Sequence, residues 1–393
     1  MVITVADGAV PARDHSLLRE VPEEAEVHTT GSFDPYQLYA WLTGKDASSA
    51  VKLGSLGQES SWKETIASWL RANAFLPDAR VGWVPFAAWR ALQLAGNADV
   101  LVTTGPPHSS HLAGWLVHRL TGLPWLADFR DPWMDINYYQ ELPQHPVAAR
   151  VDAALERRVL RDASAVASVS PSWCSLLGEK RGREGVVLIQ NGFDPADIPD
   201  EVEQDEHMFF LTHVGSLYAS RNPAALWRAL RQMDRREEAL NLRVRLVGSV
   251  ADEVWRSIDE HRVRHRIEHI SYVPHEEAAR LLCRGAMAFL SIERFPQDHG
   301  MITGKLYEYL GSGRPVVGLG PADGDAAALL RETGAGRIID RSDTIGLYDY
   351  VLRAYRQWQT GSQLRGADME RLAPYTREAQ TALLAETLDG LAS

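Results

Sequence analysis

Residues 301–317 read MITGKLYEYLGSGRPVV, one lysine and one glutamate set among apolar and turn-forming residues. Thr303 and a neighbouring glycine predict a loop and a helix start, and the glycines and proline that follow the helix at 305–312 predict its end before a strand. A lysine beside the free N–H groups at a helix start can bind an anion. The alternative is a solvated pair between Lys305 and Glu308, and the local pattern favours that alternative.

Strand-like runs recur on both sides of this stretch, each followed by a loop and a helical pattern. The runs are Ala98–Thr104, Leu123–Asp128, Ala165–Ser170, Gly185–Gln190, Met208–Gly215, Leu242–Gly248, Ile267–Val273, Ala286–Ile292 and Pro315–Leu319. Helical patterns lie near 222–236, 250–263, 275–284 and 305–312, and later at Tyr348–Trp358 and Thr376–Leu391. This alternation predicts an α/β protein with parallel strands and helical crossovers. The acidic, proline-containing segment 195–206 reads as a linker, so we expect two doubly wound, Rossmann-like domains.

Composition excludes several classes of protein. The chain has 393 residues, of which 45% are hydrophobic, enough for two cores, and its net charge of −11 argues against a nucleic-acid binder. No apolar run is long enough to span a membrane, and Met1 is not followed by a signal-like sequence, so we expect a cytoplasmic protein. Cys174 and Cys283 read as core residues, and the histidines form no ligand cluster, so we infer no metal.

An apolar stripe near residue 65 has two interpretations. It consists of Trp62, Ile66, Trp69, Leu70 and Phe75. The stripe could lie on the inner face of a membrane as a peripheral contact. Packing on the core or lining of a substrate groove is favoured, because aromatic stripes are usually buried.

The loops after the strands are where ligands bind in doubly wound sheets. After the first strong strand, Ser109 or Ser110 is expected to cap a helix. After the next, the segment 128–131 crowds two aspartates and an arginine together, as a structural pair or as substrate contacts. In the second half, Arg221 and Lys305 are both cations in loops or helix starts, and a diphosphate would need both.

Five motifs together resemble those of GT-B glycosyltransferases of family 4, the group 1 glycosyltransferases, over nearly the whole chain. They are TGPPHSSH at 104–111, ADFRDPW at 127–133, NGFD at 191–194, GSLYASRNP at 215–223 and GKLYEYLGSGRPV at 304–316. The resemblance implies two Rossmann-like domains facing a cleft. The expected boundaries are 1–197 for an acceptor domain, 205–370 for a nucleotide-sugar domain, and 371–393 for a helix packing back towards the first.

The resemblance also implies a function in carbohydrate biosynthesis. It is transfer of a hexose or related sugar from a nucleotide-diphosphate sugar, with retention, without a metal and without a cofactor. The acceptor would be a sugar, a lipid-linked sugar or a small molecule. Residues expected to be catalytic are Lys305, Arg221, Asp131 and Asp128. Donor-binding residues would be Gly215, Ser216, Arg221, Gly248, Val273, Pro274, Thr303, Gly304, Lys305, Leu306 and Glu308. Acceptor-binding residues would be Pro106, His108, Ser109, Asp128, Arg130 and Asp131.

The chain departs from the family pattern at three places. Gly300 stands where many members carry the first of two glutamates, which would shift donor-sugar contacts to Asp298, His299 and Met301. Ser216 stands where a cation is often found. The start at Val2–Ala6 resembles the family's second strand, and from this we expect an N-terminus shortened by a strand and a glycine-rich loop.

Two other functions remain open at this stage. A sugar-nucleotide epimerase shares the architecture but would need additional acid and base carboxylates. A degenerate member would bind a nucleotide-sugar without transferring it, as the missing first glutamate suggests. A dehydrogenase is disfavoured, because no G-x-G-x-x-G motif follows a strand.

Overall fold

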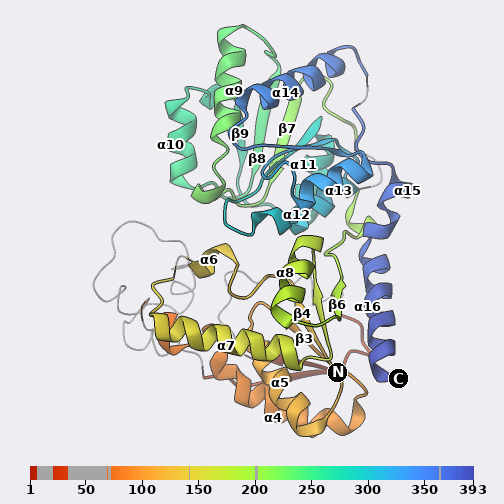
Figure 1. Cartoon of the computed structure of the whole chain (residues 1–393). Coiled ribbons are helices and arrows are strands. Elements are labelled where there is room, and N and C mark those ends of the chain that lie inside the picture. Colours follow the sequence, from red (N-terminus) through yellow and green to blue (C-terminus); the bar gives the residue numbers. More distant parts are fainter. Residues whose placement is uncertain (7–20, 34–68, 70–71, 141, 200–201, 363) are drawn as a thin grey trace. The chain divides into compact units, whose positions relative to one another are not determined.

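The computed structural model describes residues 1–6, 21–33, 69, 72–140, 142–199, 202–362 and 364–393. They form two compact units (Figure 1). Unit 1 comprises Met1–Val169, Trp173–Leu188 and Glu386–Ser393, and unit 2 comprises Ser170–Ser172 and Ile189–Ala385. Of the apolar stripe, Trp62, Ile66 and Leu70 lie outside the described residues, as do residues 7–20 near the start.

Unit 1 is built on a parallel sheet in the order β3-β4-β5-β6. Its strands are β3 (Leu101–Gly105), β4 (Trp125–Phe129), β5 (Ala165–Ser168) and β6 (Val186–Leu188), which confirms the four strands predicted there. Its helices are α4 (Val84–Leu94), α5 (Ser109–Thr121), α6 (Asn137–Gln140), α7 (Pro146–Asp162) and α8 (Pro171–Arg181). All four residues of β5 are buried, as expected for a parallel strand covered on both faces.

The start of the chain forms a separate sheet. Strand β1 (Val2–Val5) pairs in parallel with β2 (Val27–Thr30), in the register Val2 to Val27. Ile3 of β1 packs against the cluster formed by α4 and α5. The strand expected at the start is therefore present, and the shortened N-terminus stays a prediction.

Unit 2 contains a six-stranded parallel sheet in the order β12-β11-β10-β7-β8-β9. The strands are β7 (Phe209–Val214), β8 (Leu242–Val247), β9 (Ile267–Ile270), β10 (Met287–Ser291), β11 (Val316–Leu319) and β12 (Gly336–Ile339). The first five confirm predicted strands, and β12 was not predicted. The chain runs outward from β7 to β9 and then returns to the other side of β7. Strand order thus reverses between β7 and β10, the position at which doubly wound sheets bind ligands.

Helices cover both faces of this sheet (Figure 1). One core cluster joins the sheet to α9 (Ala224–Arg235), α10 (Asp252–Glu260) and α14 (Thr344–Gln359). The other joins it to α11 (His275–Arg284), α12 (Gly304–Gly311), α13 (Asp325–Thr333) and α15 (Met369–Leu372). Along β10, Met287 and Phe289 belong to the first cluster, and Ala288 and Leu290 to the second, as the two-residue period of a strand requires.

The last helix is α16 (Arg377–Ala392). Its final residues, from Glu386 onward, group with unit 1. None of the helices in the described part of the chain combines the length and apolar character needed to cross a membrane.

Candidate functional site

The side chain of Lys305 lies directly against Gly215 at the carboxyl end of β7. Gly215 has a φ of +99°, and a Cβ atom there would lie 2.5 Å from Lys305 Nζ and 2.6 Å from Lys305 Cε. Only glycine combines this backbone conformation with this close approach. The Gly215 N–H donates to the carbonyl oxygen of Val247 at 2.7 Å, so the end of β7 is held by β8. The ammonium group is therefore placed at the point where the strand order reverses.

A second glycine makes this arrangement possible. Gly248 ends β8 with a φ of +119°, and a Cβ atom there would lie 3.0 Å from the carbonyl carbon and oxygen of Gly215. The Gly248 N–H donates to Ile270 at 2.9 Å. The loops after β7 and β8 can thus pack closely, which exposes backbone groups to a ligand rather than covering them with side chains.

Lys305 has no counter-charge among the described residues. No carboxylate there lies within ion-pair distance of it, so the simple pair with Glu308 is not formed. Burial and the positive charge of Arg221 lower the pKa of Lys305 to about 8, against a smaller opposite effect of Glu308. A lysine held in this state gains most from an incoming anion.

Arg221 is the second cation of the site. It ends a 3₁₀ turn at Ala219–Arg221, its carbonyl oxygen accepts a hydrogen bond from Ser291 Oγ at 2.7 Å, and its Nε lies 3.5 Å from Glu293 Oε2. Ser291 ends β10, so Arg221 bridges the ends of β7 and β10. The sequence analysis missed Glu293; its position directly after a predicted strand was the available signal.

His213 is a buried neighbour of the two cations. Its Nδ1 lies 3.0 Å from the carbonyl oxygen of Phe289, to which it donates. Burial, Lys305 and Arg221 lower the pKa of His213 to about 3. The ring is therefore neutral at physiological pH and adds no charge to the site.

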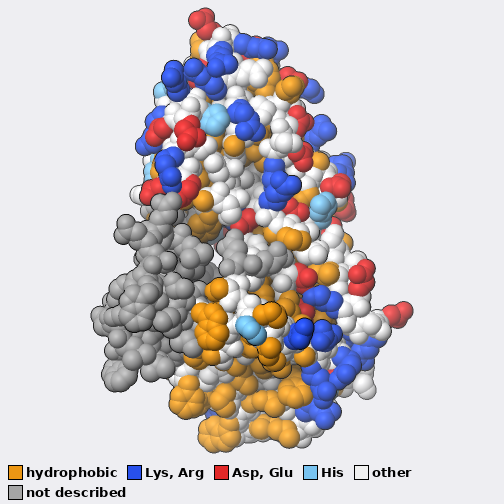
Figure 2. All heavy atoms as spheres, turned by 60° about the vertical axis from the view of Figure 1, so that its left-hand side comes forward, with side chains coloured by type: hydrophobic (Ala, Val, Ile, Leu, Met, Phe, Trp, Pro, Cys, Tyr) orange, Lys and Arg blue, Asp and Glu red, His pale blue; other side chains and the backbone are white. Residues whose placement is uncertain are grey.

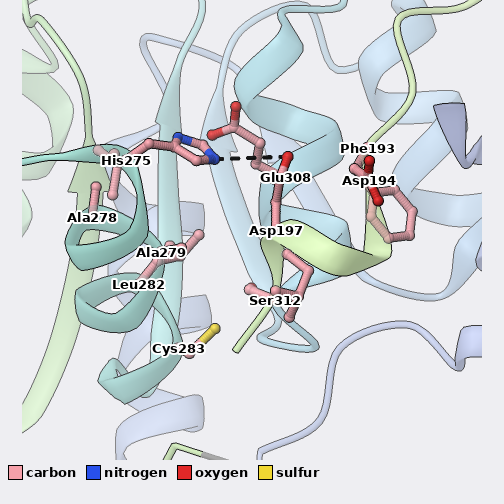
Figure 3. A pocket seen from close by; sticks show the side chains of 12 residues that line it. Phe193, Asp194, Asp197, His275, Ala278, Ala279, Leu282, Cys283, Glu308 and Ser312 are labelled. Carbon is pink, nitrogen blue, oxygen red and sulfur yellow. Dashed lines mark ion pairs between the residues drawn. The ribbon is translucent and has the colours of Figure 1, made fainter. Parts of the chain in front are cut away.

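Glu308 lies one helical turn after Lys305 and lines a pocket (Figure 3). The pocket is lined by Phe193, Asp194, Asp197, Ile198, Val214, His275, Ala278, Ala279, Leu282, Cys283, Glu308 and Ser312. Burial raises the pKa of Glu308, opposed mainly by His275 and Arg377. His275 Nε2 lies 3.9 Å from Asp197 Oδ2, and Arg377 Nη1 lies 3.4 Å from the same oxygen. The pocket combines an apolar wall with a rim of carboxylates, but its volume is only about 20 Å³.

The remaining predicted donor residues, apart from Leu306, fall into two groups. Ser216, Thr303 and Gly304 lie beside Gly215 and Lys305 in the chain, and Thr303 precedes α12 without a side-chain cap. Val273 and Pro274 precede α11, but the described lining of the pocket comes from His275 and later residues.

Leu306 differs from the expectation. Its side chain is fully buried in a core cluster of unit 2, so only its backbone can take part in binding.

The acidic segment before α12 has a separate role. Asp298 Oδ2 lies 2.8 Å from Arg341 Nη2, and His299 lies 3.1 Å from Asp298 and 3.2 Å from Asp323. Arg341 also donates to the carbonyl oxygen of Glu293 at 2.7 Å. These groups hold one another and the loop after β10, and Glu293 is the carboxylate next to Arg221.

In unit 1, Asp128 lies near the end of β4, and Arg130 and Asp131 follow the strand directly. Thr104 Oγ1 donates to Asp128 Oδ2 at 2.9 Å, and the Arg130 N–H donates to Gly105 at 3.1 Å. Burial raises the pKa of both aspartates, and the charge of Arg130 opposes this in each. The loops after β3 and β4 are thus linked, with Arg130 exposed to solvent.

The expected serine cap of α5 is wrong. The Ser109 N–H donates to Asp78 Oδ2 at 2.9 Å, so a distant carboxylate caps the helix. Ser110 Oγ donates instead to the carbonyl oxygens of Thr104 and Pro107, at 2.6 and 2.8 Å.

The predicted acceptor residues of this loop differ in accessibility. His108 is 4% exposed and stacks on Trp133 with 5.2 Å between ring centroids, and Ser109 is fully buried. Pro106 is exposed. Among the predicted residues of the β3 loop, only Pro106 therefore presents its side chain to solvent.

The thiol of Cys283 is buried, and that of Cys174 is half-buried and lies within hydrogen-bond distance of the carbonyl oxygens of Ser168 and Val187. In the described ranges no group of three or more histidine, cysteine, aspartate or glutamate side chains is placed to hold a metal ion.

Comparisons with known proteins agree with this geometry. Residues 56–192 match the family described as glycosyl transferase 4-like domain, and residues 221–332 match the family described as glycosyl transferase-like. No curated protein sequence matches the chain.

Solved structures share the fold at low sequence identity. HepE of Anabaena, in a complex with UDP and glucose, is 14% identical with a TM-score of 0.61, covering 99% of each chain. Sucrose-phosphate synthase of Thermosynechococcus elongatus is 15% identical with a TM-score of 0.61, covering 79% of this chain and 77% of its own. The two family matches support a glycosyltransferase resembling family 4, the group 1 glycosyltransferases, and the two solved structures show that the chain shares their GT-B fold.

Proposed function

We propose that the protein is a retaining glycosyltransferase that moves a sugar from a nucleotide-diphosphate donor bound by unit 2. The observation that carries the proposal is Lys305, a partly buried lysine without a described counter-charge that lies against Gly215. It occupies the position of the sheet at which doubly wound folds bind nucleotides. The solved structures of HepE in complexes with UDP and with UDP-glucose support this choice of donor.

The chemistry follows from the two cations. Cleavage of the bond between sugar and diphosphate builds negative charge on the phosphate oxygens of the leaving group. Lys305 and Arg221 are held in place before the reaction, so they stabilise this charge without reorganisation. They supply the charge that a metal ion supplies elsewhere, and we therefore propose a reaction independent of metal and of any cofactor.

The rest of the donor fits the neighbouring groups. Glu308, on the helix that also carries Lys305, accepts hydrogen bonds from the ribose hydroxyls. Backbone groups of Gly215, Ser216, Gly248, Thr303 and Gly304 approach the phosphates, with Val273 and Pro274 beside the base.

Unit 1 would bind the acceptor, a sugar, a lipid-linked sugar or a small molecule. Asp128, Arg130, Asp131 and Pro106 are the candidate contacts, since they follow neighbouring strands of one sheet. We keep the expected boundaries 1–197, 205–370 and 371–393 as part of the proposal. A cytoplasmic location and a peripheral membrane contact also stay proposals; the half-exposed side chain of Trp69 supports the contact.

A second candidate is a protein that binds a nucleotide-sugar without transferring it. Gly300 replaces a glutamate of the family pattern, and Asp298 is engaged by Arg341 rather than free for the donor sugar. Under this alternative, the nucleotide would bind and no sugar would be released.

A thermal-shift screen of nucleoside diphosphates and their sugars tests the proposal. A ligand at 100 times its dissociation constant stabilises the protein by about 2.7 kcal/mol. We expect one nucleoside diphosphate to stabilise the chain and its sugar conjugate to be consumed slowly, by transfer to water. Stabilisation without any consumption, even with candidate acceptors, would favour the binder, and no stabilisation by any nucleotide would refute both.

A further inference from the structure

We propose that unit 1 carries a second anion site, a surface cavity between α7 and α8 that binds a phosphate-bearing group. The cavity has a volume of about 290 Å³. It is lined by Ala154, Arg157, Arg158, Arg161, Lys180 and Arg181, so every lining residue except one is cationic. This proposal does not depend on the function proposed for unit 2.

Arg181 is the group that most needs a partner. Its side chain is 5% exposed, and its Nη2 donates to the carbonyl oxygens of Ala163 and Ser164 at 2.9 and 3.0 Å. Its Nε and Nη1 have no hydrogen-bond partner in the described structure. Burial and the nearby charge of Arg183 lower the pKa of Arg181 to about 10, so it remains charged at neutral pH. A buried guanidinium without a carboxylate is costly, and the charge of an anion in the cavity would lower that cost without a hydrogen bond to these two buried nitrogens.

The other lining cations are only partly neutralised. Arg158 and Arg161 share the single carboxylate of Asp162, at 2.8 and 3.1 Å. Arg157 has no hydrogen bond or ion pair within the described ranges of the chain and is exposed. The cavity therefore keeps a positive excess.

Lys180 differs from the lining arginines, because carboxylates fully neutralise its charge. It pairs with Asp135 and, at 2.9 Å, with Glu156. It contributes to the wall of the cavity without adding to the positive excess.

Helix dipoles alone do not account for this cluster. Both α7 and α8 end near the cavity, and cations at helix ends gain roughly 0.3–1 kcal/mol each. That gain is available to exposed side chains, so it gives no reason to bury Arg181 without a carboxylate. The two carbonyl contacts hold Arg181 in place, and an anionic ligand accounts for the number of arginines around it.

The position of the cavity separates it from the candidate acceptor residues. Helix α7 ends just before β5 begins, and α8 follows β5, so both helix ends lie at the amino edge of the sheet. Asp128 and Pro106 lie at the opposite, carboxyl edge. Figure 2 shows lysine and arginine side chains gathered on one side of the unit that contains α7 and α8. A group bound there is held rather than transformed.

Phosphate is the chemistry that arginine clusters recognise best, because the planar guanidinium donates two parallel hydrogen bonds to phosphate oxygens. The phosphate could belong to a soluble polyphosphorylated molecule or to the headgroup of an anionic lipid. The two sources share the same contacts, and binding experiments can tell them apart.

The experiment uses the full chain with Lys305→Ala, which is expected to weaken phosphate binding in unit 2. One arm titrates inorganic pyrophosphate by calorimetry, and the other measures sedimentation with vesicles of phosphatidylglycerol and phosphatidylcholine, against phosphatidylcholine alone. Each arm compares Arg157→Gln/Arg161→Gln with Arg150→Gln. Arg150 is exposed on the same helix but does not line the cavity.

We expect saturable binding in at least one arm, weakened about tenfold or more by the double variant, since each charge-assisted contact contributes roughly a factor of ten. Arg150→Gln should change it by less than about twofold. Binding of pyrophosphate would identify a soluble ligand, and binding only to phosphatidylglycerol vesicles a lipid headgroup. No binding in either arm, or equal losses in the double variant and in Arg150→Gln, would overturn the proposal.

Discussion

Each unit contains a partly buried lysine near a helix end, and the two have opposite pKa shifts. Burial lowers the pKa of Lys180 in unit 1, but Glu156 and Asp135 outweigh it and the net shift is upward. Burial and Arg221 lower the pKa of Lys305 in unit 2 to about 8, and Glu308 does not restore it. One ammonium is surrounded by carboxylates, whereas the other faces a second cation and a glycine.

The difference separates a lysine held by ion pairs from a lysine placed to bind an anion. Lys180 connects the loop after β4, through Asp135, to α7, through Glu156. Lys305 makes no such connection in the described structure, although burying its charge has a cost. The fold of unit 2 bears this cost, and a diphosphate between Lys305 and Arg221 would relieve it.

Alanine at each lysine should therefore give opposite outcomes. Lys305→Ala should weaken binding of a nucleoside diphosphate by roughly 10- to 150-fold, because a charge-assisted bond contributes about 1.5–3 kcal/mol. Lys180→Ala should leave that affinity unchanged and lower the free energy of unfolding by about 1–3 kcal/mol, because Glu156 is left buried and unpaired. Calorimetry and urea unfolding of both variants measure the two effects. Loss of stability in Lys305→Ala with unchanged affinity would reverse the assignment.

Gly215 tests whether Lys305 must occupy its observed position. In Gly215→Ala the new Cβ would displace Lys305 Nζ, which lies 2.5 Å from the Cβ position, and we expect affinity for the diphosphate to fall by about tenfold. Gly361→Ala is the matched control: Gly361 also has a positive φ, +75°, but no atom lies within 4 Å of its Cβ position. Both variants carry similar backbone strain. Equal affinities in the two variants would show that the approach of Lys305 to Gly215 does not matter.

The pH dependence of stability should have opposite signs for the two lysines. The unfolded pKa is near 10.5 for both. Lys305 is deprotonated in the native state from about pH 8, where the unfolded chain still binds its proton, so its contribution makes stability rise between about pH 8 and 10.5. The stabilisation from Lys180 is complete below its unfolded pKa and is lost as pH rises through the raised folded pKa.

Urea unfolding between about pH 7 and about pH 10.5 measures these contributions. The difference in the free energy of unfolding between the wild type and Lys305→Met should rise with pH over this range. The same difference between the wild type and Lys180→Met should not rise below about pH 10.5. A falling contribution from Lys305 over the same range would mean that a carboxylate pairs with it in solution.

Glu308 should give the smallest effect of the series. Glu308→Gln keeps the shape of the side chain but removes its charge, and we expect a loss of about 1 kcal/mol in affinity for a nucleoside diphosphate. Affinity for inorganic pyrophosphate, which has no ribose, should stay the same or improve slightly. Calorimetry with both ligands decides, and equal losses for both would argue against the contact with the ribose.

Local patterns in the sequence were sufficient to predict the strand end and the helix start that carry Gly215 and Lys305. Glycine after a strand and lysine at a helix start are signals within a few residues of each other, and Gly215 and Lys305 were found in this way. Asp78 could not be found as the cap of α5, because it lies 31 residues before Ser109 and only the fold brings them together. The contact between Arg221 and Glu293 depends in the same way on the reversal of strand order, which places β10 beside β7.

The sequence also did not predict which side chains of the candidate sites are buried. His108 and Ser109 have the polar side chains expected of a binding loop, yet both are buried, and the ring of His108 stacks on Phe129 and Trp133. Leu306 lies within a binding motif but faces the core. Strand β12 is short and begins at Gly336, so no apolar run in the sequence predicted it.

Titration of the Lys305 ammonium group by NMR tests the central claim most directly. The free protein should show a pKa of about 8. With the nucleoside diphosphate that gives the largest thermal shift at saturation, the phosphate charge should raise this pKa to its ordinary value of 10.5 or above. A pKa that stays near 8 with the ligand bound would contradict the assignment of Lys305 to the diphosphate.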